Sequence, residues 1–244
     1  MGDLFDLEPA GSFARMARAL LAEPDLASAL ERVVGLAVAT IDGCEHASVS
    51  VVRARHSTVR VASSETATRL EALQEEVGEG PTRDAATETF VVADDLRSDG
   101  RWHRFSARAS ASGDVRCIAA FRLFVEERRA VRADGRASVG SDERTIGTLT
   151  VSAGRAAALT KESVSIGLLL ATHGALVLAA KLRQEQLEEA LRSRDVIGQA
   201  KGILMAREGI TADQAFDRLR RASQRLNLKL RDIADQVAFT GLAP

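Results

Sequence analysis

The chain has 244 residues, of which 45% are hydrophobic, and its 33 basic and 34 acidic residues leave a net charge of -1. A chain of this size can hold one substantial core and a second, smaller one. The acidic residues 1–9 lack the basic start of a signal peptide, and the apolar stretch 166–180 contains His173 and is followed by charge. We therefore expect a cytoplasmic protein with no membrane span.

Cysteine and histidine are too scattered to indicate a metal or disulfide site. Cys44 and Cys117 belong to no CxxC pair, which argues against structural zinc and a disulfide framework. The four histidines are His46, His56, His103 and His173, and no two of them share a ligand motif. We expect no metal.

Residues 13–159 alternate between helical and extended patterns. Amphipathic helices are predicted at 13–21 and 26–41, with further helices at 68–76, 82–88 and 101–109. Short strands rich in Val and Ile are predicted at 47–52, 59–62, 90–93, 115–125 and 145–151. Gly78, Gly80 and Pro81 break the chain between two of the helices. The charged stretch 126–144 is interpreted as an exposed hairpin extension or loop. This order predicts an α+β fold with an antiparallel sheet and flanking helices.

A long connecting helix is predicted at about 161–207, with Thr160 as its N-cap. No proline interrupts this stretch, and apolar positions recur four and three residues apart, as in a coiled coil. This seam predicts parallel dimerisation, and a lone helix packed on its own domain is the alternative. The predicted dimer seam comprises Ile166, Leu170, His173, Val177, Leu187 and Leu191. Ala180 and Gln184 weaken its middle.

The end of that helix and two further helices are predicted to form a small bundle. Gly209 is expected to end the first helix, and Thr211 with Gln214 predicts a capping box for the second. Asn227 is expected to cap the third helix. The predicted core is Ile197, Ala200 and Leu204 from the first helix, Ala215, Phe216, Leu219, Ala222 and Leu226 from the second, and Leu230, Ile233, Ala234 and Val237 from the third.

Basic residues are concentrated in this tail. From Arg192 onward there are ten basic and six acidic residues, a net charge of +4, while the residues before it sum to -5. That sign fits a polyanionic partner. Arg218, Arg221 and Arg225 are expected on one side of the second helix, where their mutual repulsion would be relieved by a polyanion.

The tail resembles an ANTAR domain, a module that binds RNA hairpins in transcription antitermination. The resemblance rests on a run in the first helix, on Ala215, Phe216, Leu219 and Arg220, and on residues 223–234. The run is Arg194, Ile197, Gly198, Gln199, Ala200, Lys201, Gly202, Ile203, Leu204 and Met205. The resemblance implies a regulator with hairpin RNA as partner. The predicted RNA contacts are Arg194, Gly198, Gln199, Lys201, Arg218, Arg220, Arg221, Arg225, Lys229 and Arg231.

The part before the tail is similar to a GAF domain. The residues that carry this similarity are Gly78, Glu79, Gly80, Pro81, Asp84, Ala85, Asp94, Asp95, Leu96, Arg101, Trp102, Phe105, Gly147, Thr148 and Leu149. A GAF fold implies that a small ligand can bind between sheet and helices, but the signature of the cyclic-nucleotide type needs an asparagine, and Asn227 is the only one. Trp102 and Phe105 are interpreted as core, and Asp94 and Asp95 as capping or loop residues.

The expected organisation is a GAF-like sensor at 13–182 and an ANTAR RNA-binding domain at 183–240. The runner-up function is a DNA-binding regulator, disfavoured because no single helix collects the residues that read bases. A thiol-dependent GAF enzyme, with Cys44 and Cys117 as its only candidates, is a further alternative. The chain has no Walker, GxSxG or HExxH motif, so we expect no enzyme.

Overall fold

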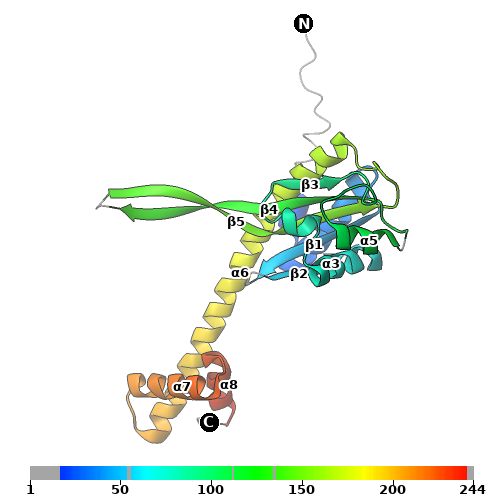
Figure 1. Cartoon of the computed structure of the whole chain (residues 1–244). Helices are drawn as coiled ribbons and strands as arrows, with labels where there is room; N and C mark the ends of the chain where they lie inside the picture. The colour runs from blue at the N-terminus through cyan, green and yellow to red at the C-terminus, as the bar shows by residue number, and fades with distance from the viewer. Residues whose placement is uncertain (1–16, 54–55, 112, 134–135, 241–244) are drawn as a thin grey trace. The chain divides into compact units, whose positions relative to one another are not determined.

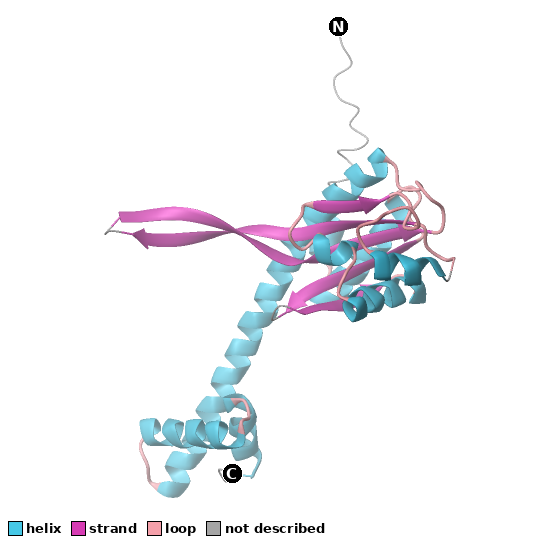
Figure 2. Ribbon diagram, in the orientation of Figure 1, coloured by secondary structure: helices cyan, strands magenta, loops and turns pink. Residues whose placement is uncertain are grey.

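The computed structural model describes residues 17–53, 56–111, 113–133 and 136–240. The chain divides into two compact units, Met1–Lys181 and Leu182–Pro244. Residues 17–22 are helical, and the predicted start of that helix at 13–16 lies outside the described residues. Figure 2 shows the division by secondary structure: all strands belong to the first unit, and the second contains helices only.

An antiparallel five-stranded sheet organises the first unit, with strand order β2-β1-β5-β4-β3 (Figure 1). Its strands are β1 (His46–Arg53), β2 (His56–Ala62), β3 (Phe90–Ala93), β4 (Cys117–Ala133) and β5 (Arg136–Ala153). All five predicted strands are present, and the predicted fold class is confirmed. The last two strands are longer than predicted because they continue as a paired hairpin out to Ala133 and Arg136, which is the predicted extension at 126–144.

One face of the sheet is covered by α2 (Leu26–Thr40) and by the first part of α6 (Lys161–Glu208). Alternate residues of β4 point to this face because side chains in a strand alternate between its two sides. Phe121 lies so close to Gly167 of α6 that an added Cβ would come 2.6 Å from its Cε2 atom. Gly167 therefore permits the close approach of helix and sheet.

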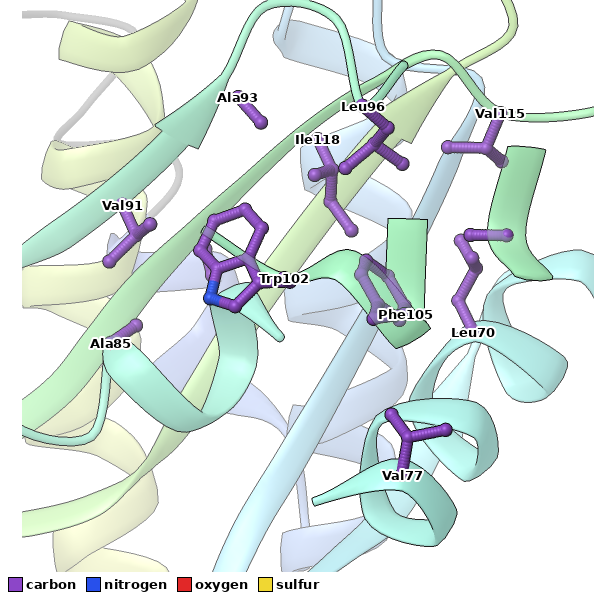
Figure 3. Close-up of a cluster of buried hydrophobic side chains, with 12 residues drawn as sticks. Leu70, Val77, Ala85, Val91, Ala93, Leu96, Trp102, Phe105, Val115 and Ile118 are labelled. Atoms are coloured by element: carbon purple, nitrogen blue, oxygen red, sulfur yellow. The ribbon is translucent and has the colours of Figure 1, made fainter. Parts of the chain in front are cut away.

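The other face is covered by α3 (Glu65–Val77), α4 (Pro81–Asp84) and α5 (His103–Ala111). Figure 3 shows the apolar cluster between them, in which Trp102 and Phe105 meet edge to face with ring centroids 6.5 Å apart. Both rings are buried, as predicted. Helix α4 is shorter than the predicted 82–88, and its Asp84 accepts a 2.8 Å hydrogen bond from Trp102 Nε1.

Several residues that carry the similarity to a GAF domain connect the helices and loops on this face of the sheet. Gly80 has φ of +141°, and a Cβ there would lie 2.8 Å from Gln74 Cδ, so both its backbone and its neighbour require glycine. Glu79 accepts hydrogen bonds from the N–H groups of Arg104 and Phe105 at the start of α5. Asp95 pairs with Arg116 and accepts from the Arg97 N–H, so it holds its loop in place and caps no helix.

Helix α6 begins as predicted, with Thr160 and Ser163 each accepting from the other's backbone N–H at 3.2 and 3.0 Å. Contrary to expectation, the helix is long and apolar enough to cross a membrane by length and composition alone, but 44% of its most apolar window is buried in the protein. Two residues in the first half of the predicted dimer seam are buried, whereas Ile166 and His173 of the same half are partly exposed. Leu170 and Val177 are 0% and 5% exposed because they pack inside the first unit. Leu169 and Leu176 are exposed instead.

The second unit is a three-helix bundle formed by the end of α6, α7 (Ala212–Leu226) and α8 (Leu230–Thr240). Its core is Ala200, Leu204, Ala215, Leu219, Ala222, Ile233, Ala234 and Val237. The predicted signals at the first turn are confirmed: Gly209 has φ of +66° after α6, and Thr211 and Gln214 form a capping box.

Three predictions about the bundle are wrong. Phe216 and Leu226 are 38% and 42% exposed, so neither belongs to the core. Asn227 caps the end of α7 rather than the start of α8, with a left-handed φ of +52° and its N–H bonded to the Ser223 carbonyl. A short polar side chain tolerates this conformation better than most.

Candidate nucleic-acid interface

The end of α6 presents a mixed stripe to solvent. Arg194, Gly198 and Met205 are exposed and Lys201 is half-buried, while Ala200 and Leu204 on the opposite side are buried. An added Cβ at Gly198 would meet nothing within 4 Å. No packing contact among the described residues requires a glycine at position 198, although glycine costs an exposed helix about 0.5–1 kcal/mol relative to alanine.

Helix α7 carries the densest group of cations, divided between two sides of the helix. Arg218, Arg221 and Arg225 follow at helical spacing on one side and are exposed, while Arg220 lies on another. Two of these cations have acidic partners within the second unit: Arg218 pairs with Glu208, and Arg220 lies 2.8 Å from Asp217. These pairs are exposed, so they are weak and can exchange for a polyanion.

The two cations at the start of α8 differ from each other in their ion pairing. Lys229 is exposed, but Arg231 pairs with Glu189 of α6 and with Asp232. The hydrogen bonds that Arg231 donates to Asp232 and Glu189 raise the pKa of its guanidinium. Arg231 lines a groove of about 420 Å³ together with Glu189, Arg192, Ser193, Val196, Asp232 and Asp235. Arg231 therefore lies among carboxylates and apart from the cations of α7.

Not all of the predicted contact residues are engaged within the protein. Among the described residues, Arg194, Arg221 and Lys229 form no ion pair. Gln199 is exposed on α6. Within its described part, the bundle thus combines cations that form no ion pair, cations in exposed pairs, and one cation held between two carboxylates.

A family model describes this arrangement of helices: the ANTAR domain matches residues 185–237. The chain contains an ANTAR domain. The match begins within α6 and ends in α8, so it includes the exposed stripe of α6 and every cation of α7. No curated protein matches the chain.

Solved structures show the fold of the remainder. The GAF domain of an Acinetobacter phosphoenolpyruvate-protein phosphotransferase superposes with a TM-score of 0.50 at 11% identity, covering 72% of this chain and 95% of that one. The phytochrome photosensory core module of Stigmatella aurantiaca gives 0.51 at 13% identity, covering 92% of this chain. A bacteriophytochrome of R. palustris gives 0.51 at 12% identity and covers 90%. This chain spans about half of each phytochrome, 47% and 48%. The unit before the ANTAR domain has a GAF-like fold.

The interior of the GAF-like unit contains a buried polar cluster that the sequence did not reveal. Glu71 of α3 accepts hydrogen bonds from Ser48 and Ser50 of β1 at 2.9 and 3.2 Å and from Thr82 of α4 at 3.1 Å. Thr82 also bonds Thr150 of β5 at 2.9 Å. Burial raises the pKa of the Glu71 carboxyl, and the hydroxyl donors oppose that rise. The cluster lies between the sheet and the helices, where the GAF resemblance implies a ligand.

The thiols are poorly suited to catalysis. Cys44 and Cys117 are both free. Burial raises the pKa of the Cys44 thiol to about 12 and raises the pKa of Cys117 as well. A nucleophilic thiol needs a lowered pKa. In the described part of the chain, no three His, Cys, Asp or Glu side chains gather as metal ligands.

Proposed function

We propose that the protein is a signal-responsive RNA-binding regulator that acts by transcription antitermination. The observation that carries this proposal is the ANTAR domain at 185–237, with exposed cations on α6 and α7. Hairpin RNA is the partner because its phosphates match these cations and its loop offers unstacked bases. Binding would stabilise an antiterminator hairpin over a terminator.

The proposed contacts fall into two groups. Arg194, Lys201, Arg221 and Lys229 are the cations that form no ion pair within the described residues. Arg218, Arg220 and Arg225 join them on binding, and Gly198 and Gln199 allow close approach and hydrogen bonding. Arg231 is the weakest member of the set, because releasing it would leave Glu189 and Asp232 without their cation.

The protein acts as a homodimer in this proposal. Within the second unit, Leu187 and Leu191 are each 59% exposed on α6 at the predicted seam. In a parallel pair, Arg183 beside this seam would face Glu188 of the other copy, five residues further along. The charge pattern therefore favours a parallel dimer with two RNA-binding bundles.

The GAF-like unit is proposed to receive the signal in the cytoplasm. A small molecule that displaces or reorganises the Glu71 cluster would change the packing of α3 and α4 on the sheet. Such a ligand would shift the balance between two conformations of the unit only by the difference in its affinity for them. The thiol-enzyme alternative has no support from the raised thiol pKa values.

The experiment compares hairpin RNA with duplex DNA of the same stem sequence. We expect the full chain to bind a pool of hairpins that share one stem and carry a randomised loop more tightly than it binds the DNA duplex. Affinity should fall with added salt, since phosphate contacts release counterions. Equal or tighter binding of the duplex DNA would replace this proposal with the DNA-binding alternative.

A further inference from the structure

Phe216 is an aromatic side chain that the core of the bundle does not enclose. Its neighbours Ala215, Leu219 and Ala222 on α7 are at most 4% exposed, whereas Phe216 is 38% exposed. The ring lies at the border between the buried side of α7 and solvent. Part of a large apolar surface is therefore left in water.

Positive charge lies near this ring. The ammonium group of Lys201 on α6 lies 5.9 Å from the ring centroid. Arg220 follows Phe216 by one turn of α7, so the two residues are neighbours on the helix surface. The site thus combines a partly exposed aromatic ring with nearby positive charge.

We propose that Phe216 is a stacking platform for one unpaired base of the RNA loop, with Lys201 neutralising the adjoining phosphate. The inference rests on the proposed function and adds how the bundle distinguishes a loop from a duplex. A base offers a flat π surface to an aromatic ring and carries a phosphate for the cation. Bases inside a duplex are already stacked on each other, so only a splayed base can reach the ring.

Another exposed aromatic residue provides a matched control. Phe239 on α8 is 93% exposed, more than Phe216. Among the described cations, none lies over its ring. If exposure of an aromatic ring were by itself enough for base stacking, substitution of Phe239 would weaken hairpin binding more than substitution of Phe216. The proposal predicts the opposite order.

The test measures two affinities for each variant of the full chain. The probes are the hairpin pool with one stem and a randomised loop, and the same stem as a blunt RNA duplex. We expect Phe216→Leu to weaken hairpin binding about tenfold, the scale of one lost base stack, and to leave duplex binding unchanged. Phe216→Tyr should retain the preference for the hairpin, and Phe239→Leu should change neither affinity.

The outcomes separate this inference from the proposed function. If no hairpin binds better than the duplex, the proposed function fails and the inference fails with it. If the wild type prefers the hairpin and Phe216→Leu keeps that preference in full, only the inference is overturned.

A second measurement does not depend on the folding of any variant. In the wild-type complex, 5-iodouracil in the loop should form a photo-crosslink to the peptide that contains Phe216. Crosslinks found only elsewhere would overturn the inference.

Discussion

The hydroxyl of Thr82 on α4 donates a 3.1 Å hydrogen bond to the carboxylate of Glu71 on α3, and both side chains are buried between the sheet and the helices. Through this bond the short helix α4 is tied to the longer helix α3. Ser48 and Ser50 connect the same carboxylate to β1. One ionisable group therefore joins three elements of the GAF-like unit.

We expect Glu71→Gln to flatten the pH dependence of stability. Because burial raises the pKa of Glu71 in the folded state, its favourable contribution is complete below the unfolded value of about 4.3 and is lost as the pH rises through the folded value. A neutral amide has no such loss. The free energy of unfolding should thus fall less in the variant than in the wild type as the pH rises above about 4.3.

Urea unfolding followed by the fluorescence of Trp102 measures this effect, because Trp102 is the only tryptophan and is buried in the same unit. Glu75→Gln removes a negative charge from the exposed side of the same helix and controls for net charge. Equal pH dependence in Glu71→Gln and the wild type would contradict the prediction.

Gly167→Ala should destabilise the GAF-like unit. The added methyl group would lie 2.6 and 2.8 Å from two ring carbons of the buried Phe121, so helix and sheet must separate or the ring must move. Overpacking of this kind costs about 1–3 kcal/mol. Gly35→Ala is the matched control on α2, where the new Cβ meets nothing within 4 Å. It should stabilise the unit by about 0.5–1 kcal/mol. Denaturant midpoints read from Trp102 decide the prediction, and similar shifts for both variants would speak against it.

Arg221→Gln should weaken hairpin RNA binding and reduce the slope of log affinity against log salt by about 0.7–0.9. The reason is that Arg221 is exposed and has no ion-pair partner among the described residues. Arg231→Gln should change the slope much less, since Arg231 is held by Glu189 and Asp232. Titrations at several salt concentrations measure both slopes. A larger change for Arg231→Gln would reverse our ranking of the contacts.

Light scattering tests the dimer. We expect the full chain to be dimeric and the double variant Leu187→Asn with Leu191→Asn to be monomeric, because both exposed leucines would leave the seam. Arg183→Glu alone should weaken the dimer, and Arg183→Glu combined with Glu188→Arg should restore it. A wild-type chain that is monomeric at every concentration would remove the proposal.

Local signals in the sequence predicted the elements of the structure well. Thr160, Gly209 and the Thr211–Gln214 capping box mark helix ends because each acts on the backbone within a few residues. The five strands followed from their Val and Ile content for the same reason. The ANTAR match at 185–237 agrees with the resemblance seen in the sequence.

Partners distant in the sequence could not be predicted in this way. Nothing in the sequence around Glu71 marks it as buried, and it becomes so only because β1 and α4 approach α3. Phe216 fitted the helical period of a core residue, yet the geometry of the bundle leaves it partly exposed. The spacing of apolar residues predicts which side of a helix faces the core. It does not specify how far the neighbouring helix covers that side.

The amino-acid sequence by itself determined which segments form helices and strands, and that the tail carries the positive charge, because both depend on residues close together in the chain. The tertiary structure decided which of those charges are paired and which apolar positions stay in water. Leu170 is buried inside the first unit, while Leu187 on the same helix is exposed. Burial and ion pairing depend on which surfaces meet, and that is settled only when the elements pack.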